Sequence, residues 1–360
     1  MRVGRTSVIV VAGALTLAGC GSTGGGGTGG TDGAAEDTPS FDAQELTLDV
    51  EEGSLDGRTI CFSFQALETE FWAAGVVAIS EGLRTAGAEV IEYNSNEDAN
   101  RQLEQIQDCI TQDVDGIIFI PQDGESAVTI IGAANDADVP IAAFNRPPAD
   151  DSRPAIVAVA DNREISRQTN EYLAEQARAL GRKVQPLIMV GDLGDENAVA
   201  RRDGFFDVVN ANPDLFETPI EVETKWDATT AQQNLQSALQ ANPDIDLLFT
   251  SSDFMYPQIQ SLLEQQGRWA PVGEEGHVIL GGLDGDNRAC NLMRDGYVDA
   301  TGVQDLFRES EDAISALTEA IANGETQPAE RLVDPGFALT QDNLGEREQD
   351  MWGCVVEPPQ

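Results

Sequence analysis

The apolar run Gly116-Ile-Ile-Phe-Ile120 decides the fold class of this chain. Large apolar side chains at successive positions point to both faces of a strand, a pattern typical of a parallel sheet covered by helices. Residues 100–111 before the run and 126–137 after it have helical apolar spacing. The run therefore predicts the central strand of an α/β unit.

The same alternation of strand-like and helix-like segments extends along most of the chain. In its first part we expect strands at 59–64, 90–93, 116–120 and 140–144, with helices at 71–86, 100–111 and 126–137. The rhythm restarts after Asp151, with strands at 155–160, 186–190, 220–224, 246–250 and 277–283 and helices at 165–180, 198–210, 229–241 and up to 266. Two such runs predict two Rossmann-like α/β lobes with parallel sheets and right-handed crossovers.

Ligands of open α/β sheets bind outside the carboxyl ends of the strands. The segments at those ends are polar, with aromatic and planar groups among them: 65–72, 121–123, 145–146, 161–162, 192–201, 226–227, 251–253, 284 and 304. We expect the functional residues in these segments.

The amino terminus has the three parts of a secretory signal. Arg2 and Arg5 precede an apolar stretch at 8–17, and Leu17-Ala18-Gly19-Cys20 resembles a bacterial lipobox. The alternatives are an ordinary signal peptide or a transmembrane helix, which needs roughly 20 apolar residues. We expect a signal peptide at 1–19, a lipid on Cys20, and a protein held on the extracytoplasmic face of the cell membrane.

A linker is expected at 20–56. Residues 21–37 are nearly all Gly, Thr, Ser and Ala and cannot bury enough apolar area to offset their ordering entropy. Residues 41–56 are acidic, and we treat them as a lead-in rather than as core.

The composition is strongly acidic. The chain holds 63 acidic and 21 basic residues, for a net charge of −42. Such a charge repels nucleic acid and anionic substrates. It says nothing about the fold, and solubility or a saline habitat explains it more simply than an acid-specific function.

Four cysteines remain besides Cys20, an even number that permits two disulfides in an exported protein. Three pairings are possible; we favour Cys61 with Cys109 and Cys290 with Cys354, against four free buried thiols. A metal site is not expected, because the chain has no Cys-x-x-Cys and only one histidine, His277.

Several stretches, taken in order and spacing, resemble the periplasmic sugar-binding proteins of the ribose/galactose type, the solute receptors of ABC importers. They are Asn100-Arg-Gln-Leu-Glu-Gln-Ile106, Val114-Asp-Gly-Ile-Ile-Phe-Ile-Pro121, Phe144-Asn-Arg146, Asn242-Pro-Asp-Ile-Asp246 and Gly282-Leu-Asp-Gly285. The resemblance covers about residues 58–340.

The resemblance implies two lobes joined by a three-segment hinge, with lobe 1 at 57–160 plus 305–332 and lobe 2 at 161–304 plus 333–360. The chain would cross near Asp161, between Asp284 and Gln304, and after Leu332, and residues 331–340 would form a strand of lobe 2. The tail at 341–360 departs from the family in length, and Cys354 would pin it.

The resemblance also implies nine ligand-binding residues: Phe71, Trp72, Asn145, Arg146, Arg201, Trp226, Ser252, Asp284 and Gln304. Two positions depart from the family. Thr69-Glu70 replaces Asn-Pro before the aromatic pair, and Ser252 replaces an asparagine. These changes argue against simple ribose binding.

The chemistry of these side chains suits a sugar independently of the family. Aromatic rings cover the C–H faces of a pyranose, and planar guanidinium, amide and carboxylate groups bind neighbouring hydroxyls in pairs. Each residue also has a plainer interpretation. Trp72 or Trp226 could be core, Arg146 a surface residue, Asp284-Gly285 a turn, and Asp161-Asn162 a hinge or helix cap.

The function expected is a monomeric receptor that closes on a neutral sugar or polyol and delivers it to an ABC permease. A sensor for a membrane kinase and a receptor for a non-sugar polar solute are the alternatives. An enzyme is not expected, since no Gly-x-Ser-x-Gly, Walker or His-Glu-x-x-His motif occurs. We expect no cofactor, no metal and no nucleic-acid partner.

Overall fold

The computed structural model describes residue 41 and residues 46–356. The expected signal peptide, the lipid-anchored Cys20 and the Gly-rich segment 21–37 lie outside these described residues. Within them, no helix is both long enough and apolar enough to cross a membrane.

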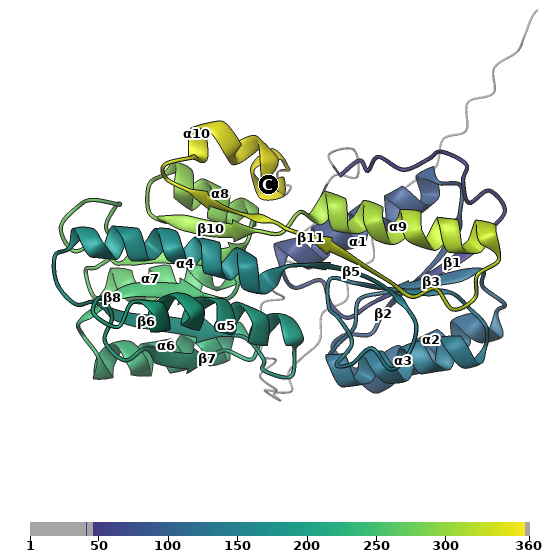
Figure 1. Ribbon diagram of the computed structural model, residues 1–360, viewed down its shortest axis with the longest axis horizontal. Helices are drawn as coiled ribbons and strands as arrows, with labels where there is room; N and C mark the ends of the chain where they lie inside the picture. Colours follow the sequence, from purple (N-terminus) through teal and green to yellow (C-terminus); the bar gives the residue numbers. More distant parts are fainter. Residues whose placement is uncertain (1–40, 42–45, 357–360) are drawn as a thin grey trace, which may run out of the picture. The chain divides into compact units, whose positions relative to one another are not determined.

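The first sheet has six strands in the order β11-β5-β4-β3-β1-β2, and all its neighbouring pairs are parallel (Figure 1). The strands are β1 (Thr59–Phe64), β2 (Glu89–Asn94), β3 (Gly116–Phe119), β4 (Ile141–Phe144), β5 (Ile156–Ala160) and β11 (Glu330–Asp334). β3, the apolar run that predicted the fold class, is buried along its whole length.

Helices cover both faces of the first sheet, and together they form the first lobe. α1 (Glu70–Thr85) and α9 (Leu306–Asn323) pack on one face, and α2 (Ala99–Thr111) and α3 (Gly124–Asp136) on the other. The side chains of Thr69, Asp98 and Asp123 accept hydrogen bonds from the first-turn amides of α1, α2 and α3, so each helix begins at a capping residue. A disulfide joins Cys61 of β1 to Cys109 of α2.

The second sheet has the order β12-β10-β9-β8-β6-β7 and is parallel except for β12, which runs antiparallel to β10. Its strands are β6 (Gln185–Val190), β7 (Ile220–Glu223), β8 (Ile245–Thr250), β9 (Ile279–Asp284), β10 (Ala300–Val303) and β12 (Phe337–Thr340). The two sheets confirm the expected α/β fold class.

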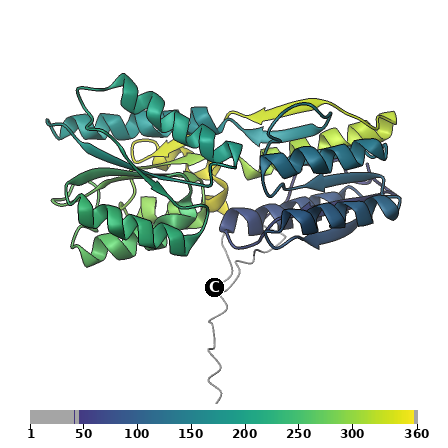
Figure 2. The same ribbon diagram turned by 90° about the horizontal axis from the view of Figure 1, so that it is seen from below.

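The second lobe is this sheet with its helices, whose layers can be followed in Figure 2. One face carries α4 (Asn162–Ala179) and α5 (Glu196–Ala211), and the other α6 (Ala228–Ala241), α7 (Tyr256–Gln265) and α8 (Asn287–Arg294). Shorter turns are η1 (Asp253–Met255), α10 (Leu344–Arg347), η2 (Glu348–Asp350) and α11 (Trp352–Val355). The second disulfide joins Cys290 of α8 to Cys354 of α11.

The second chain crossing follows β10, because α8 and β10 still belong to the second lobe. One expectation about the third crossing is wrong. Residues 331–340 are not one strand: β11 pairs with β5 in the first sheet and β12 with β10 in the second. The break falls at Gly336, which has a left-handed φ of 50° and donates its N–H to Asp334.

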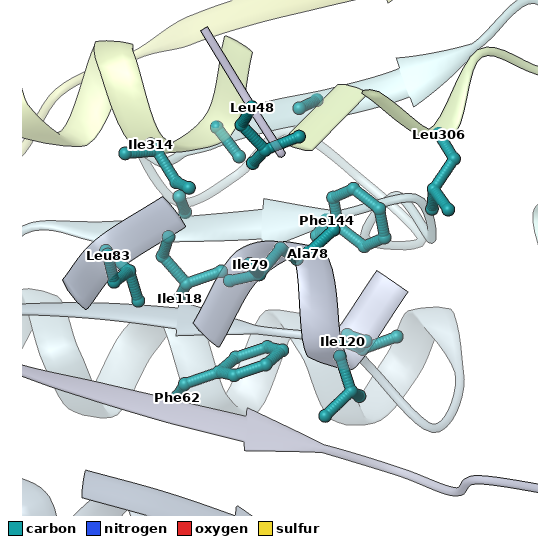
Figure 3. Close-up of a cluster of buried hydrophobic side chains, with 14 of the residues drawn as sticks. Leu48, Phe62, Ala78, Ile79, Leu83, Ile118, Ile120, Phe144, Leu306 and Ile314 are labelled. Carbon is teal, nitrogen blue, oxygen red and sulfur yellow. The ribbon is translucent and has the colours of Figure 1, made fainter. Parts of the chain in front are cut away.

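The segment that leads into β1 is core rather than linker, which corrects the expectation for residues 46–56. Leu46, Leu48 and Leu55 are buried in the apolar cluster of the first lobe. Figure 3 shows Leu48 beside Ile314 of α9. Gly82 of α1 makes the room, since a Cβ there would come within 2.8 Å of both side chains. The acidic composition of the segment suggested a linker, but the acidic residues between these leucines are exposed while the leucines themselves are buried.

Replacing Leu48 by alanine should therefore lower the free energy of unfolding by about 2–5 kcal/mol, the usual effect of emptying a buried leucine site. Urea denaturation measures the loss. Leu180→Ala, at a position 46% exposed, is the matched control and should change stability by no more than about 0.5 kcal/mol. Equal stability of the two variants would contradict a core role for the segment.

His277 precedes β9 and joins it to its neighbour through a charged hydrogen bond. Its Nδ1 lies 2.8 Å from the Ala270 carbonyl and its Nε2 lies 2.8 Å from Asp299 Oδ2. Both partners accept, so both ring nitrogens carry protons. Burial by itself lowers the pKa of His277, but the hydrogen bond and charge of Asp299 outweigh it and raise that pKa.

Since His277 is the only histidine, a single imidazole signal reports its titration in the intact protein. We expect NMR to give a pKa above about 6.5, the ordinary histidine value. Because the folded pKa exceeds the unfolded one, the pair stabilises the fold fully below pH 6.5 or so and loses that contribution as pH rises through the folded pKa. Asp299→Asn should bring the pKa down, and a wild-type value at or below 6.5 would disprove the pairing.

Candidate functional site

Polar side chains from both lobes converge where strands of the two sheets end. Asn145 and Arg146 follow β4, Ser252 follows β8, Asp284 ends β9 and Gln304 follows β10. Every one of these five side chains is buried. Buried polar groups need hydrogen-bond partners, and here they find them largely in one another.

Asp284 is the centre of this group. Its Oδ1 accepts from Arg201 at 2.8 Å and from Gln304 at 2.9 Å, and its Oδ2 accepts a short hydrogen bond from Ser252. Burial raises the pKa of Asp284, while the charge of Arg201 and the Ser252 hydroxyl act against that rise. The carboxylate thus draws together α5 and the ends of three strands.

Arg201 is held by more than its ion pair. Its Nε donates to Asn162 at 2.6 Å, and one terminal nitrogen also donates to the Ser251 carbonyl at 2.7 Å. Asn162 was expected to belong to a hinge or cap; its neighbour Asp161 does cap α4, whereas Asn162 orients the guanidinium. The guanidinium carbon of Arg201 lies over the ring of Trp226, 5.9 Å from its centroid.

Arg146 provides the corresponding guanidinium of the first lobe. It lies 5.2 Å from the ring of Trp72 and donates to the carbonyls of Pro121 and Gln122. Its Nε forms an ion pair at 3.0 Å with Asp195 of the second lobe. Arg146 is therefore not the surface residue of the plainer interpretation.

Asp195 contacts two of the expected site residues, Trp226 and Arg146, but was not itself among the residues expected from the sequence. Its Oδ2 accepts from Trp226 Nε1 at 3.1 Å and faces Arg146, while its Oδ1 caps α5. The residue lies within 192–201, a segment flagged only because it follows a strand. Nothing in the sequence separated Asp195 from its acidic neighbours, since the contact depends on both lobes.

Asn145 links the lobes through its amide. Its Nδ2 donates to Gln304 at 2.9 Å and to Glu309 of α9 at 3.0 Å, and its Oδ1 accepts from Asn197 of α5 at 3.2 Å. Burial, reinforced by the charge of Asp334, raises the pKa of Glu309 well above its ordinary value. Asn197 lies in the expected strand-end segment 192–201 but was not singled out there. Glu309 was not expected at all, because no pattern in the sequence of α9 marks one acid among several.

Three residues of the site have backbone conformations that side chains rarely adopt. The φ angle is 63° at Asn145, 57° at Trp226 and 139° at Asp284. Strained backbone of this kind costs about 1–3 kcal/mol per residue and gathers at functional sites. These three are among eight residues other than glycine with positive φ in the described part of the chain, and at the site this backbone directs their side chains toward the polar group.

Phe71 is the one expected residue that the structure does not bring to the polar group. It is buried in the apolar core of the first lobe, edge-on to Trp72 at 5.2 Å and to Trp352 at 5.9 Å. Trp72 and Trp226 are only partly buried. Among the described residues, no cluster of three or more His, Cys, Asp or Glu is arranged to hold a metal ion.

A hollow of about 460 Å³ lies elsewhere, near the carboxyl ends of α4 and α5. Its basic lining is already paired, since Arg182 binds Asp246 and Arg178 binds Asn212. None of the polar residues that meet at the strand ends lines this hollow. We therefore place the candidate site at the strand ends and not in this hollow.

Removing one partner of a buried ion pair leaves the other charge unpaired, at a cost of about 3–5 kcal/mol. Arg201→Ala should accordingly lower the free energy of unfolding by about that amount at pH 7, and by less at acid pH where Asp284 takes up a proton. Arg202→Ala is the matched control, because Arg202 makes surface contacts, among them an ion pair with Glu221 and a cation–π contact with Phe206, each worth about 1 kcal/mol or less. Chemical denaturation of both variants at pH 5 and pH 7 measures the difference; similar losses would refute the central role of the pair.

Comparison with known proteins identifies relatives that this chain matches over most of their length. A D-apiose import binding protein of Actinobacillus succinogenes is 23% identical over 278 residues, covering 77% of this chain and 86% of its own. A putative rhizopine-binding protein of Rhizobium meliloti is 27% identical over 252 residues, covering 69% and 79%.

Solved structures agree on the fold. An ABC transporter solute binding protein from Bacillus halodurans with bound myo-inositol superposes with a TM-score of 0.70 at 26% identity, covering 82% of this chain and 98% of its own. The family model described as a periplasmic binding protein domain matches residues 60–326. With two covered α/β sheets and polar groups converging at their strand ends, the chain belongs to the periplasmic binding protein domain family.

Proposed function

We propose that this protein is an extracytoplasmic receptor that binds a neutral sugar or polyol between its lobes and delivers it to the permease of an ABC importer. The nine side chains expected from the sequence are proposed as its ligand-binding set, with Asp195 and Asn197 added. Phe71 acts in this set by supporting Trp72 from the core.

The charge balance of the site carries the proposal of a neutral solute. Each of its two guanidiniums already faces a carboxylate, Arg146 with Asp195 and Arg201 with Asp284. Among the described residues that form the site, no further cationic group is left over to offset the charge of a phosphate or carboxylate on the solute. Hydroxyl groups, which both donate and accept, suit a site in which guanidinium, amide and carboxylate groups alternate.

The aromatic residues support a solute with apolar faces. Trp72 and Trp226 come from different lobes, and each lies beside a guanidinium of the site. A sugar ring has C–H faces for such indoles and a belt of hydroxyls for the polar groups between them. The combination favours a cyclic polyol over an amino acid or another polar solute.

The names of relatives point the same way. Several contain a sugar or polyol: apiose, xylitol, ribose, xylose and allose. Those named import binding proteins favour delivery to a transporter over signalling to a membrane kinase. Tethering through a lipid on Cys20 belongs to the proposal and rests on the lipobox pattern alone.

Binding would work by a shift of population between open and closed lobes. The contacts of Arg146 with Asp195 and of Asn145 with Asn197 connect the lobes. A solute that touches residues of both lobes makes more contacts when they are together, so it favours the closed form. The closed form would then be the one presented to the permease.

A thermal-shift screen of residues 21–360 tests the proposal. The compounds are D-ribose, D-xylose, D-allose, xylitol and myo-inositol, with D-glucuronate and ribose 5-phosphate as anionic comparators. A ligand at a hundredfold excess over its dissociation constant stabilises the folded state by about 2.7 kcal/mol, enough to raise the midpoint visibly. We expect at least one neutral compound, and neither anion, to do so.

Variants tie any shift to the site. Arg146→Ala and Asp284→Asn should abolish the response, whereas Arg202→Ala, which alters an exposed pair, should preserve it. A response to the anions alone, or one that survives both site substitutions, would count against this function.

A further inference from the structure

The carboxyl-terminal segment 351–356, here called the strap, is fastened to the second lobe. The Cys290–Cys354 disulfide attaches it to α8. Asn287, the first residue of α8, donates its side-chain amide to the Gly353 carbonyl at 3.0 Å. The strap thus has covalent and hydrogen-bonded support from the lobe that carries Asp284.

The largest side chain of the strap is inserted toward the other lobe. Trp352 is 1% exposed and belongs to the apolar cluster of the first lobe, whereas Met351 and Cys354 belong to a cluster of the second. Its ring lies edge-on to Phe71 of α1 at 5.9 Å. Phe71 in turn contacts Trp72, so the indole supports one wall of the candidate site from behind.

The N–H of the same indole also contacts the opposite side of the candidate site, at Asp284. Trp352 Nε1 donates to the backbone carbonyl of Asp284 at 3.1 Å, and the Gly353 amide donates to the next carbonyl, that of Gly285, at 3.1 Å. These hydrogen bonds fall on a turn whose φ angles are 139° and 87°. Strained backbone persists only where its surroundings hold it.

The strap lies so close to this turn that only glycine fits at its point of contact. A Cβ on Gly353 would overlap backbone atoms of Gly285 and Asp286, which cannot move aside as a flexible side chain would. The two segments are therefore matched to each other in shape as well as in hydrogen bonding.

We propose that Trp352 is a positioning residue for the solute site. Its N–H fixes the strained carbonyl of Asp284, and thereby the carboxylate that Arg201, Ser252 and Gln304 share. Its ring fixes Phe71 behind Trp72. The consequence for solute affinity rests on the proposed function, whereas the consequence for the geometry of the site does not.

Trp352→Phe tests this role because it keeps an aromatic ring and removes the N–H. The chain has four tryptophans, so incorporation of 5-fluorotryptophan gives four ¹⁹F signals in the wild type and three in the variant. We expect the Trp226 signal to move, since Asp284 reaches Trp226 through Arg201. The Trp269 signal should stay in place, because that ring stacks on Tyr297 apart from the site.

Solute binding is measured in the same variant by calorimetric titration with D-ribose, D-xylose, D-allose, xylitol and myo-inositol. A carbonyl left without its donor predicts a roughly tenfold weaker affinity for any of them that the wild type binds. Trp269→Phe is the matched control and should bind as the wild type does. The Cys290→Ser/Cys354→Ser double variant, which releases the strap without touching the indole, should move the Trp226 signal as well.

The outcomes separate the two proposals. An unmoved Trp226 signal in Trp352→Phe, or unchanged affinity for a compound that the wild type binds, overturns the positioning role. A moved Trp226 signal in a protein that binds none of the five compounds supports the positioning role and contradicts the proposed solute class instead.

Discussion

Burial of the Asp284 carboxylate is the constraint on which the rest of this structure depends. A carboxylate shielded from water is tolerated only with a counter-charge and with donors for its remaining lone pairs. Here these come from Arg201 on α5, Ser252 after β8 and Gln304 after β10. Satisfying one charge therefore sets the relative positions of a helix and three strand ends.

The contacts between the lobes differ in kind from those within them. Each sheet is covered by apolar clusters on both faces, whereas Arg146, Asp195, Asn145 and Asn197 meet across the lobes through polar groups. Apolar packing makes each lobe a rigid unit. Polar contacts exchange readily with water or with a hydroxylated ligand, so they suit an interface that opens and closes. The side chains of Trp352 and Val356, which belong to the apolar cluster of the first lobe, are apolar exceptions to this pattern.

Much of the fold was predictable because period and capping act locally. Residues 116–120 read as a doubly buried strand, and β3 is one. The chain crossings were harder to place: a break at Gly336 assigns β11 and β12 to different sheets, although both are short runs in one stretch of sequence. The leucines at 46–55 were missed for the opposite reason, since local composition is acidic while burial is decided by α1 and α9.

The sequence by itself determined the class of fold, the alternation of elements and the strand ends at which polar residues gather, because these follow from spacing along the chain. Only the tertiary structure decided which polar residues meet. Asp195 contacts both Arg146 and Trp226, and Glu309 accepts a hydrogen bond from Asn145. These partners are far apart in the sequence, so no local pattern predicts the contacts. The tertiary structure also buries Phe71 in the core against Trp352, and it places the indole N–H of Trp352 against the backbone carbonyl of Asp284. Such contacts depend on how two lobes and a carboxyl-terminal segment pack in space, which spacing along one chain does not encode.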